Sequence, residues 1–371
     1  MTDATEGAAS TPPRTPKQEQ EPAQREVTEV APGVLRMQLP IKMPGLGHVN
    51  AYALTDDRGA TVVDPGVPGP GNWKALVERL GQAELSVRDV HTVVVTHSHI
   101  DHFGTAARLA RAAGAEFVTH EDFAVPWLGV QQHDCTRHDG AHDEAADDDT
   151  PAAPDRIRPN WHERTPWGGD PIRPPRSRRM IFWMMRRLAR RALLPPVPSR
   201  RVAHGEVLTL AGREWFAVHT PGHTLDHLCL HDPEHGVLLS GDHVLPTITP
   251  HISGVGTGDD PLQNFVESLD LVGGIGGVRV TLPAHGHPFD DLPGRVEDIK
   301  VHHEGRLERL REFGREMGRP ATVREFSHRL FRKARWGPMA ESETYAHLEH
   351  LRHLGQAERS QRGSIVYYEL D

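Results

Sequence analysis

Short apolar runs separated by polar turns fill the first third of the chain. Segments 34–39 and 49–54 have the length and composition of strands, and 92–95 is a continuous apolar run typical of a buried strand. Helical patterns are found at about 73–80 and 105–113. The order of strand, loop, helix and strand predicts an α/β fold.

A second block of the same kind begins near residue 202 and contains two predicted hairpins, one helix and one further strand. These elements are expected at 206–219, 228–239, about 261–271 and 278–282, respectively. From about residue 297 the pattern becomes helical and charged, and strands return only near residue 371.

Residues 121–201 interrupt the two blocks. An acidic stretch is followed by one rich in proline and arginine, within which residues 180–191 have the pattern of a basic amphipathic helix. We expect an insertion that packs the apolar face of this helix against the domain. A lid over the substrate, a contact between two copies of the chain and a contact with a membrane surface remain open alternatives.

The chain has 371 residues, more than one compact domain usually needs, so a catalytic domain with a smaller appendage is expected. Residues 1–26 are polar and lack apolar periodicity, which predicts a disordered tail. No apolar run is long enough to span a bilayer and no secretory pattern is found, so the expected location is the cytoplasm. The net charge of −9 argues against a general nucleic-acid-binding surface.

Histidine and aspartate residues are concentrated directly after the strand at 92–95. His97, His99, Asp101 and His102 fall within six positions. Imidazole nitrogens and carboxylate oxygens are typical zinc ligands, and so many of them can converge only in a loop at the end of a strand. The pattern therefore predicts a metal site at this edge of the sheet.

Three further ligand-type residues also follow strands, each beside a glycine that permits a tight turn. They are His223 after Gly222, Asp242 after Gly241 and His285 before Gly286. Strand ends on one edge of an α/β sandwich gather in a single cleft. Seven ligands are too many for one tetrahedral zinc ion and suit two.

Other histidines carry less weight, because the chain contains 26 of them. Six near the pattern are interpreted as packed or solvated and not as ligands. They are His48, His219, His227, His243, His251 and His287. Cys229, which alternates with leucines in a predicted strand, is expected in the core.

The order His-x-His-x-Asp-His, a lone His, an Asp and a last His resembles that of the metallo-β-lactamase superfamily, over about residues 34–288 apart from the insertion. The resemblance implies an αββα sandwich, two sheets with helices outside, over residues 27–296. It assigns His97, His99 and His223 to one metal, Asp101, His102 and His285 to a second, Asp242 to a bridge between them, and Asp64 to a supporting role. Two Zn²⁺ ions are expected, with manganese and iron left open.

Two cations held in this way lower the pKa of a shared water, so that hydroxide is the expected nucleophile. Asp101 is the candidate that orients this water and accepts its proton. The metals do not select the bond, because family members with similar ligands cleave thioesters, lactones, β-lactams and phosphodiesters.

Residues 297–371 form a segment of a different kind. Helical patterns at 323–332 and 341–354 precede a hairpin at 357–368, an order that resembles a winged helix. Some β-lactamase-like hydrolases, endoribonucleases among them, carry such a segment after a linking helix like that at 302–307. Packing or dimerisation is favoured over nucleic-acid binding, because no clean basic stripe is present.

Three functions follow, in order of preference. The first is a zinc hydrolase of small-molecule esters or thioesters, similar to glyoxalase II-like thioesterases, in which arginines of the insertion meet an anionic substrate. The second is a metal-dependent endoribonuclease, and the third is a non-catalytic, metal-containing regulator that binds DNA. The sequence does not identify the residues that bind substrate, and it leaves a homodimer open.

Overall fold

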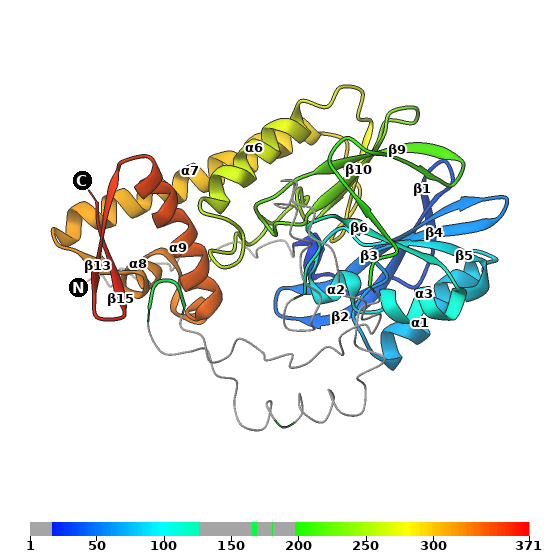
Figure 1. Cartoon of the computed structure of the whole chain (residues 1–371), viewed down its shortest axis with the longest axis horizontal. Helices are drawn as coiled ribbons and strands as arrows, with labels where there is room; N and C mark the ends of the chain where they lie inside the picture. Colours follow the sequence, from blue (N-terminus) through cyan, green and yellow to red (C-terminus); the bar gives the residue numbers. More distant parts are fainter. Residues whose placement is uncertain (1–16, 126–164, 169–179, 181–196, 371) are drawn as a thin grey trace, which may run out of the picture.

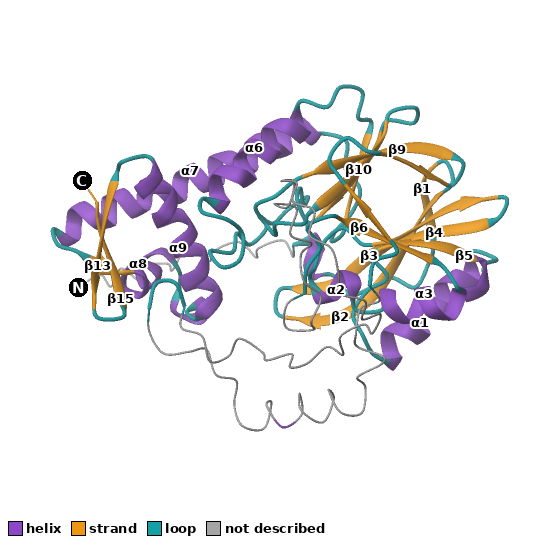
Figure 2. Ribbon diagram, viewed as in Figure 1, coloured by secondary structure: helices purple, strands orange, loops and turns teal. Residues whose placement is uncertain are grey.

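The computed structural model describes residues 17–125, 165–168, 180 and 197–370. Two β-sheets lie face to face, and a C-terminal segment of helices with a small sheet lies at the far end of the molecule (Figure 1). Helices cover the outer faces of both large sheets (Figure 2). The predicted αββα sandwich is therefore confirmed.

The first sheet has seven strands in the order β1-β2-β3-β4-β5-β6-β7. The strands are β1 (Thr28–Ala31), β2 (Val34–Met43), β3 (Leu46–Asp56), β4 (Gly59–Val63), β5 (Val90–Val94), β6 (Glu116–His120) and β7 (Arg200–Val202). Strands β4 to β7 are parallel to one another, so their carboxyl ends lie at one edge. The segments after β4 and β5, which carry Asp64 and the cluster that begins at His97, leave the sheet at this edge.

The second sheet has five strands in the order β12-β11-β10-β9-β8. The strands are β8 (Val207–Leu210), β9 (Arg213–His219), β10 (Leu228–Asp232), β11 (Val237–Gly241) and β12 (Val280–Pro283). Strands β9 and β11 both pair antiparallel with β10, and β12 is parallel to β11. Strands β9, β11 and β12 therefore run in one direction. His223, Asp242 and His285 follow the carboxyl ends of these three strands.

Alternation along each strand divides the apolar residues between two faces. In β5, Val94 belongs to the core between the sheets, and Val93 faces the outer layer. That outer layer contains α1 (Pro70–Gln82) and α3 (Ala106–Ala113). Trp215 of β9 is fully buried in the core between the sheets.

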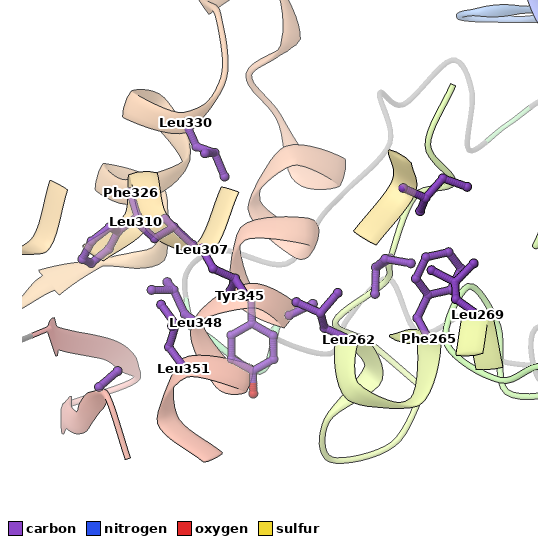
Figure 3. Packing of buried hydrophobic residues seen from close by; sticks show 14 of the residues in the cluster. Leu262, Phe265, Leu269, Leu307, Leu310, Phe326, Leu330, Tyr345, Leu348 and Leu351 are labelled. Atoms are coloured by element: carbon purple, nitrogen blue, oxygen red, sulfur yellow. The ribbon is translucent and has the colours of Figure 1, made fainter. Parts of the chain in front are cut away.

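The outer face of the second sheet packs against α6 (Pro261–Gly273) and the C-terminal segment. Cys229 of β10 lies in this layer, as predicted, and burial raises the pKa of its thiol to about 12. Leu262 and Phe265 of α6 share one apolar cluster with Leu348 and Tyr345 (Figure 3). The sandwich and the C-terminal segment are therefore joined by a continuous core.

The C-terminal segment begins with a long helix that runs away from the sandwich (Figure 1). Its elements are α7 (Leu292–Met317), β13 (Ala321–Thr322), α8 (Val323–Leu330), η4 (Lys333–Arg335), α9 (Pro338–His353), β14 (Ala357–Arg362) and β15 (Ile365–Leu370). The strands form a sheet in the order β13-β15-β14. Helix α7 crosses the expected domain boundary at 296/297, and the winged-helix assignment stays a prediction.

Two sequence predictions differ from the structure, and a third concerns residues that the structure does not describe. Residues 17–26, assigned to a disordered tail, are ordered: η1 (Gln18–Gln20) carries a buried Glu19 whose carboxylate accepts the backbone N–H of Thr247 at 2.8 Å. Residues 200–201, assigned to the insertion, pair with β6 as part of β7. The helix predicted at 180–191 lies outside the described residues except for Met180.

No described helix combines the length and the apolar character that a membrane span requires.

A pair of buried histidines joins α7 to α9. His347 donates its Nδ1–H to the Glu343 carbonyl (2.7 Å), so its Nε2 accepts the Nδ1–H of His303 (3.0 Å). His303 Nε2 is buried without a hydrogen-bond partner, so this arrangement needs only one proton on each ring. Burial lowers the pKa of His347 to about 4 and lowers that of His303 well below its ordinary value.

We expect this pair to make stability fall as the pH falls from about 6.5 towards 4. Below about pH 6.5 the unfolded chain binds protons at these histidines, whereas the folded chain does not until the pH nears the folded pKa. His347→Gln can make similar hydrogen bonds but has no titrating ring. Urea denaturation at a series of pH values gives the slope of the unfolding free energy against pH. Between about pH 6.5 and 4, this slope should be smaller in the variant than in the wild type by up to about 1.4 kcal/mol per pH unit. Equal slopes for the two proteins would contradict the expectation.

Candidate metal centre

The seven residues predicted as ligands come from four loops and meet at one edge of the sandwich. His97 and His99 follow β5, and His99 precedes the short helix α2 (Ile100–Phe103), which carries Asp101 and His102. His223, Asp242 and His285 follow β9, β11 and β12, respectively. All seven are buried except His99, which is half-buried.

The seven side chains form two adjoining groups. Ligand-type atoms lie within 4.8 Å of one another in each group, which consist of His97, His99, His223 and Asp242, and of Asp101, His102 and His285. Asp242 faces both groups. Its Oδ2 lies 3.6 Å from His223 Nε2 and 3.6 Å from His102 Nε2, and its Oδ1 lies 3.3 Å from His285 Nε2.

Four of the histidines present the same nitrogen to the centre, because each Nδ1–H is occupied by an oxygen acceptor. The acceptors are Thr96 Oγ1 for His97 (3.0 Å), Asp64 Oδ2 for His102 (2.8 Å), the His251 carbonyl for His223 (2.7 Å) and the His48 carbonyl for His285 (2.6 Å). The proton on Nδ1 leaves the Nε2 lone pair directed at the carboxylates.

These lone pairs create a demand for a cation. Nε2 of His97, His102 and His285 is buried without a hydrogen-bond partner, and so is Oδ1 of Asp242. Leaving a buried acceptor unsatisfied costs about 1–3 kcal/mol. Divalent cations bound by imidazole nitrogens and carboxylate oxygens would satisfy all four atoms, so these residues fit a metal centre.

The charges around the centre support the same assignment. Burial and the neighbouring histidines hold the pKa of His97 and of His99 well below the ordinary value, so both rings are neutral and able to bind a metal. Although burial raises the pKa of Asp242, His285 and His102 hold it well below its usual range. Burial lowers the pKa of His102, but Asp242 and Asp101 raise it well above its ordinary value, so these carboxylates attract positive charge to the place that a cation would take.

Asp64 supports the centre from the end of β4, where the resemblance places it. Its Oδ2 accepts from His102 Nδ1 at 2.8 Å and from the Thr96 hydroxyl at 2.7 Å, and its Oδ1 accepts the Thr96 N–H at 2.8 Å. The backbone of Asp64 is left-handed, with φ of 51°, a conformation that is uncommon for residues other than glycine. Three hydrogen bonds hold the side chain in place despite this backbone strain.

Three histidines that the sequence interprets as packed or solvated also brace the centre. His48 and His251 act through their carbonyl oxygens, as described above. His227 donates from Nδ1 to Thr220 Oγ1 (2.7 Å), and its Nε2 accepts the N–H of Asp242 (3.0 Å). Backbone acceptors leave no sequence signal, so the sequence could not identify the first two.

Gly241 shows why a glycine precedes Asp242. Its φ is 52°, and a Cβ there would lie 2.6 Å from His227 Nε2. Any larger residue would displace the ring that accepts the N–H of Asp242.

A third group of ligand-type residues consists of His120, Asp122 and His219. The rings of His120 and His219 are stacked, with centroids 3.9 Å apart and planes 17° from parallel. A metal lies in the plane of each imidazole that binds it, and nearly parallel stacked planes share no such point. His219 Nε2 instead donates to the Leu225 carbonyl at 2.6 Å, so this pair packs against the loop that carries His223.

A sequence model of the metallo-beta-lactamase superfamily matches residues 44–276, more than half of the chain. The chain belongs to the metallo-beta-lactamase superfamily. It is accordingly a metal-dependent hydrolase, and its His and Asp groups could hold divalent cations.

Two solved structures resemble nearly the whole chain. A family protein from Thermus thermophilus is 28% identical with a TM-score of 0.68, and covers 92% of this chain and 100% of its own. A beta-lactamase domain protein from Burkholderia ambifaria is 26% identical with a TM-score of 0.67, and covers 94% of this chain and 96% of its own. The likeness therefore includes the C-terminal segment.

Among curated proteins, the chain resembles the lactamase-like protein nscB of Aspergillus fumigatus. The two are 35% identical over 115 residues, which are 31% of this chain and 32% of that protein. The match thus spans about a third of this relative.

Proposed function

We propose that this superfamily member is a dinuclear zinc hydrolase of small-molecule esters or thioesters. The observation that carries the proposal is the position of Asp242, whose two carboxylate oxygens face the histidines of both groups. A carboxylate between two sets of nitrogen donors suits two cations and not one. Zinc is proposed because nitrogen and carboxylate donors suit its coordination.

Two bound cations would supply a water of lowered pKa and stabilise negative charge on the electrophile. The chain's own residues position the reactants around them. Asp101 is buried, and its Oδ2 lies 3.6 Å from His285 Nε2 and 3.8 Å from His102 Nε2. We assign Asp101 the role of orienting the attacking water and accepting its proton.

A small molecule is the proposed substrate because the protein as a whole is acidic. A net charge of −9 opposes association with a long polyanion such as RNA, unless a local basic surface offsets it. The lactamase-like name of the relative also points to acyl transfer to water. Ester and thioester carbonyls are the electrophiles that this combination favours.

The test is turnover by zinc-loaded full-length protein on an acyl-glutathione thioester, a simple lactone and a short single-stranded RNA. We expect cleavage of the thioester or lactone, and a loss of about 10³-fold or more in Asp101→Ala, since positioned acid–base groups contribute roughly 10²–10⁴-fold. Zinc content and the circular dichroism spectrum of the variant show whether the fold and at least one ion remain.

Selective cleavage of the RNA would replace this proposal with a metal-dependent ribonuclease. Turnover that is unchanged in Asp101→Ala would contradict the role of Asp101. Hydrolysis that survives complete removal of metal by a chelator would contradict the metal centre itself.

A further inference from the structure

The loop between β11 and α6 orients a predicted metal ligand. The carbonyl oxygen of His251 in this loop accepts the Nδ1–H of His223 at 2.7 Å. This bond directs Nε2 of His223 towards Asp242 Oδ2 (3.6 Å) and His99 Nδ1 (3.0 Å). The position of the His251 backbone therefore decides whether the His223 lone pair faces the centre.

The C-terminal segment holds His251 from its other side. Nδ1 of His251 lies 3.5 Å from Oε2 of Glu343 on α9, and Oε1 of Glu343 pairs with Arg306 on α7. Glu343 is buried. Burial raises its pKa, but Arg306 and His251 hold the pKa well below its usual range, so this carboxylate is charged near neutral pH.

Helix α9 also contacts the same loop on the far side of His251. Ser342 Oγ accepts the N–H of Gly254 at 3.0 Å, and a Cβ on Gly254 would lie 2.6 Å from Tyr345. Further along, His350 Nδ1 lies 2.9 Å from Asp260. The loop therefore packs on α9 through these contacts. Among them, the contact of Glu343 is the one made with His251, whose carbonyl accepts the hydrogen bond of His223.

We propose that Glu343 is a positioning residue of the metal centre, which acts on His223 through His251. Through these contacts the C-terminal segment would affect the affinity of the centre for metal. The inference rests on the proposed metal centre for its effect on zinc. Its effect on the His223 ring exists without zinc. Mutation of a residue that orients a metal-binding histidine typically lowers metal affinity by 10–100-fold.

A purely structural role for Glu343 is the competing explanation, because the Arg306 pair also joins α7 to α9. Two variants of the full-length protein separate the roles. Glu343→Gln removes the negative charge that faces both His251 and Arg306. His251→Asn removes the contact of the His251 ring and leaves Arg306 paired with Glu343. Ser342→Ala is the matched control, since it breaks a neighbouring contact between α9 and the loop.

The first measurement is long-range ¹H–¹⁵N NMR of the histidine rings in metal-free protein, with His223→Gln to assign the His223 signals. We expect both His251→Asn and Glu343→Gln to change the His223 ring shifts, while Ser342→Ala does not. The second is zinc titration against a chromophoric chelator. The dissociation constant of the weaker zinc site should rise about tenfold in both variants. The melting temperature of metal-free His251→Asn should equal that of the metal-free wild type.

Wild-type His223 shifts and zinc affinities in both variants would overturn the inference, as would equal effects in Ser342→Ala. If the wild-type protein binds no zinc, the proposed function fails, and the NMR comparison alone decides the role of Glu343.

Discussion

Replacing Asp242 with alanine is expected to slow hydrolysis strongly and to lower the zinc content of the protein. Asp242 is the carboxylate that faces His102, His223 and His285 together. Without it, the two groups share no ligand, and four buried imidazoles surround an uncharged gap. We expect kcat/KM to fall by roughly 10³-fold or more, equivalent to about 4 kcal/mol of transition-state stabilisation.

Steady-state kinetics and elemental analysis of the purified variant test this expectation. Asp122→Ala is the control, because Asp122 belongs to the group whose stacked histidines cannot share an ion. That variant should keep wild-type kinetics and zinc content. An Asp242→Ala protein that retains two ions and near wild-type turnover would refute the bridging position.

Replacing Trp167 with alanine is expected to cost about 3 kcal/mol of the free energy of unfolding, the usual loss for a buried tryptophan. Trp167 is 4% exposed and lies in the apolar cluster shared by α6 and the C-terminal segment. Its ring centroid is 5.2 Å from that of Tyr345, and its Nε1–H donates to Glu341 at 3.2 Å. Its carbonyl accepts the N–H of Val366 at 3.1 Å.

Urea denaturation of the variant tests this prediction, with Trp167→Phe as the matched control. Phenylalanine keeps one aromatic ring against Tyr345 but loses the second ring of the indole and the hydrogen bond to Glu341, so a smaller cost of about 1–2 kcal/mol is expected. A loss below about 0.5 kcal/mol in Trp167→Ala, the range of an ordinary surface substitution, would show that the contact does not stabilise the fold.

Trp167 also shows what the pattern could not predict. It lies inside the segment 121–201, which the sequence separates from the sandwich as an insertion. Its contacts are with residues of α9 and β15, about 175–200 positions further along. The residues around Trp167 are mostly prolines, glycines and charged residues without apolar periodicity, so nothing local indicates where this tryptophan packs.

The strands and helices of the sandwich, by contrast, follow from local pattern. The apolar run at 92–95 matches β5, and the alternation around Cys229 matches β10. The short edge strands β1, β7 and β13 were not predicted. Strands of two to four residues contain too few positions for alternation to show, and partner strands determine whether they form.

The sequence by itself determined the ligand types and their location after strands, because the chemistry of a metal requires particular side chains in tight turns. Only the tertiary structure decided what orients them. His285 donates to the carbonyl of His48, 237 positions away, and His223 depends on a loop seated on α9. Such contacts use backbone oxygens, which every residue has, so their partners are selected by the path of the chain and not by residue identity.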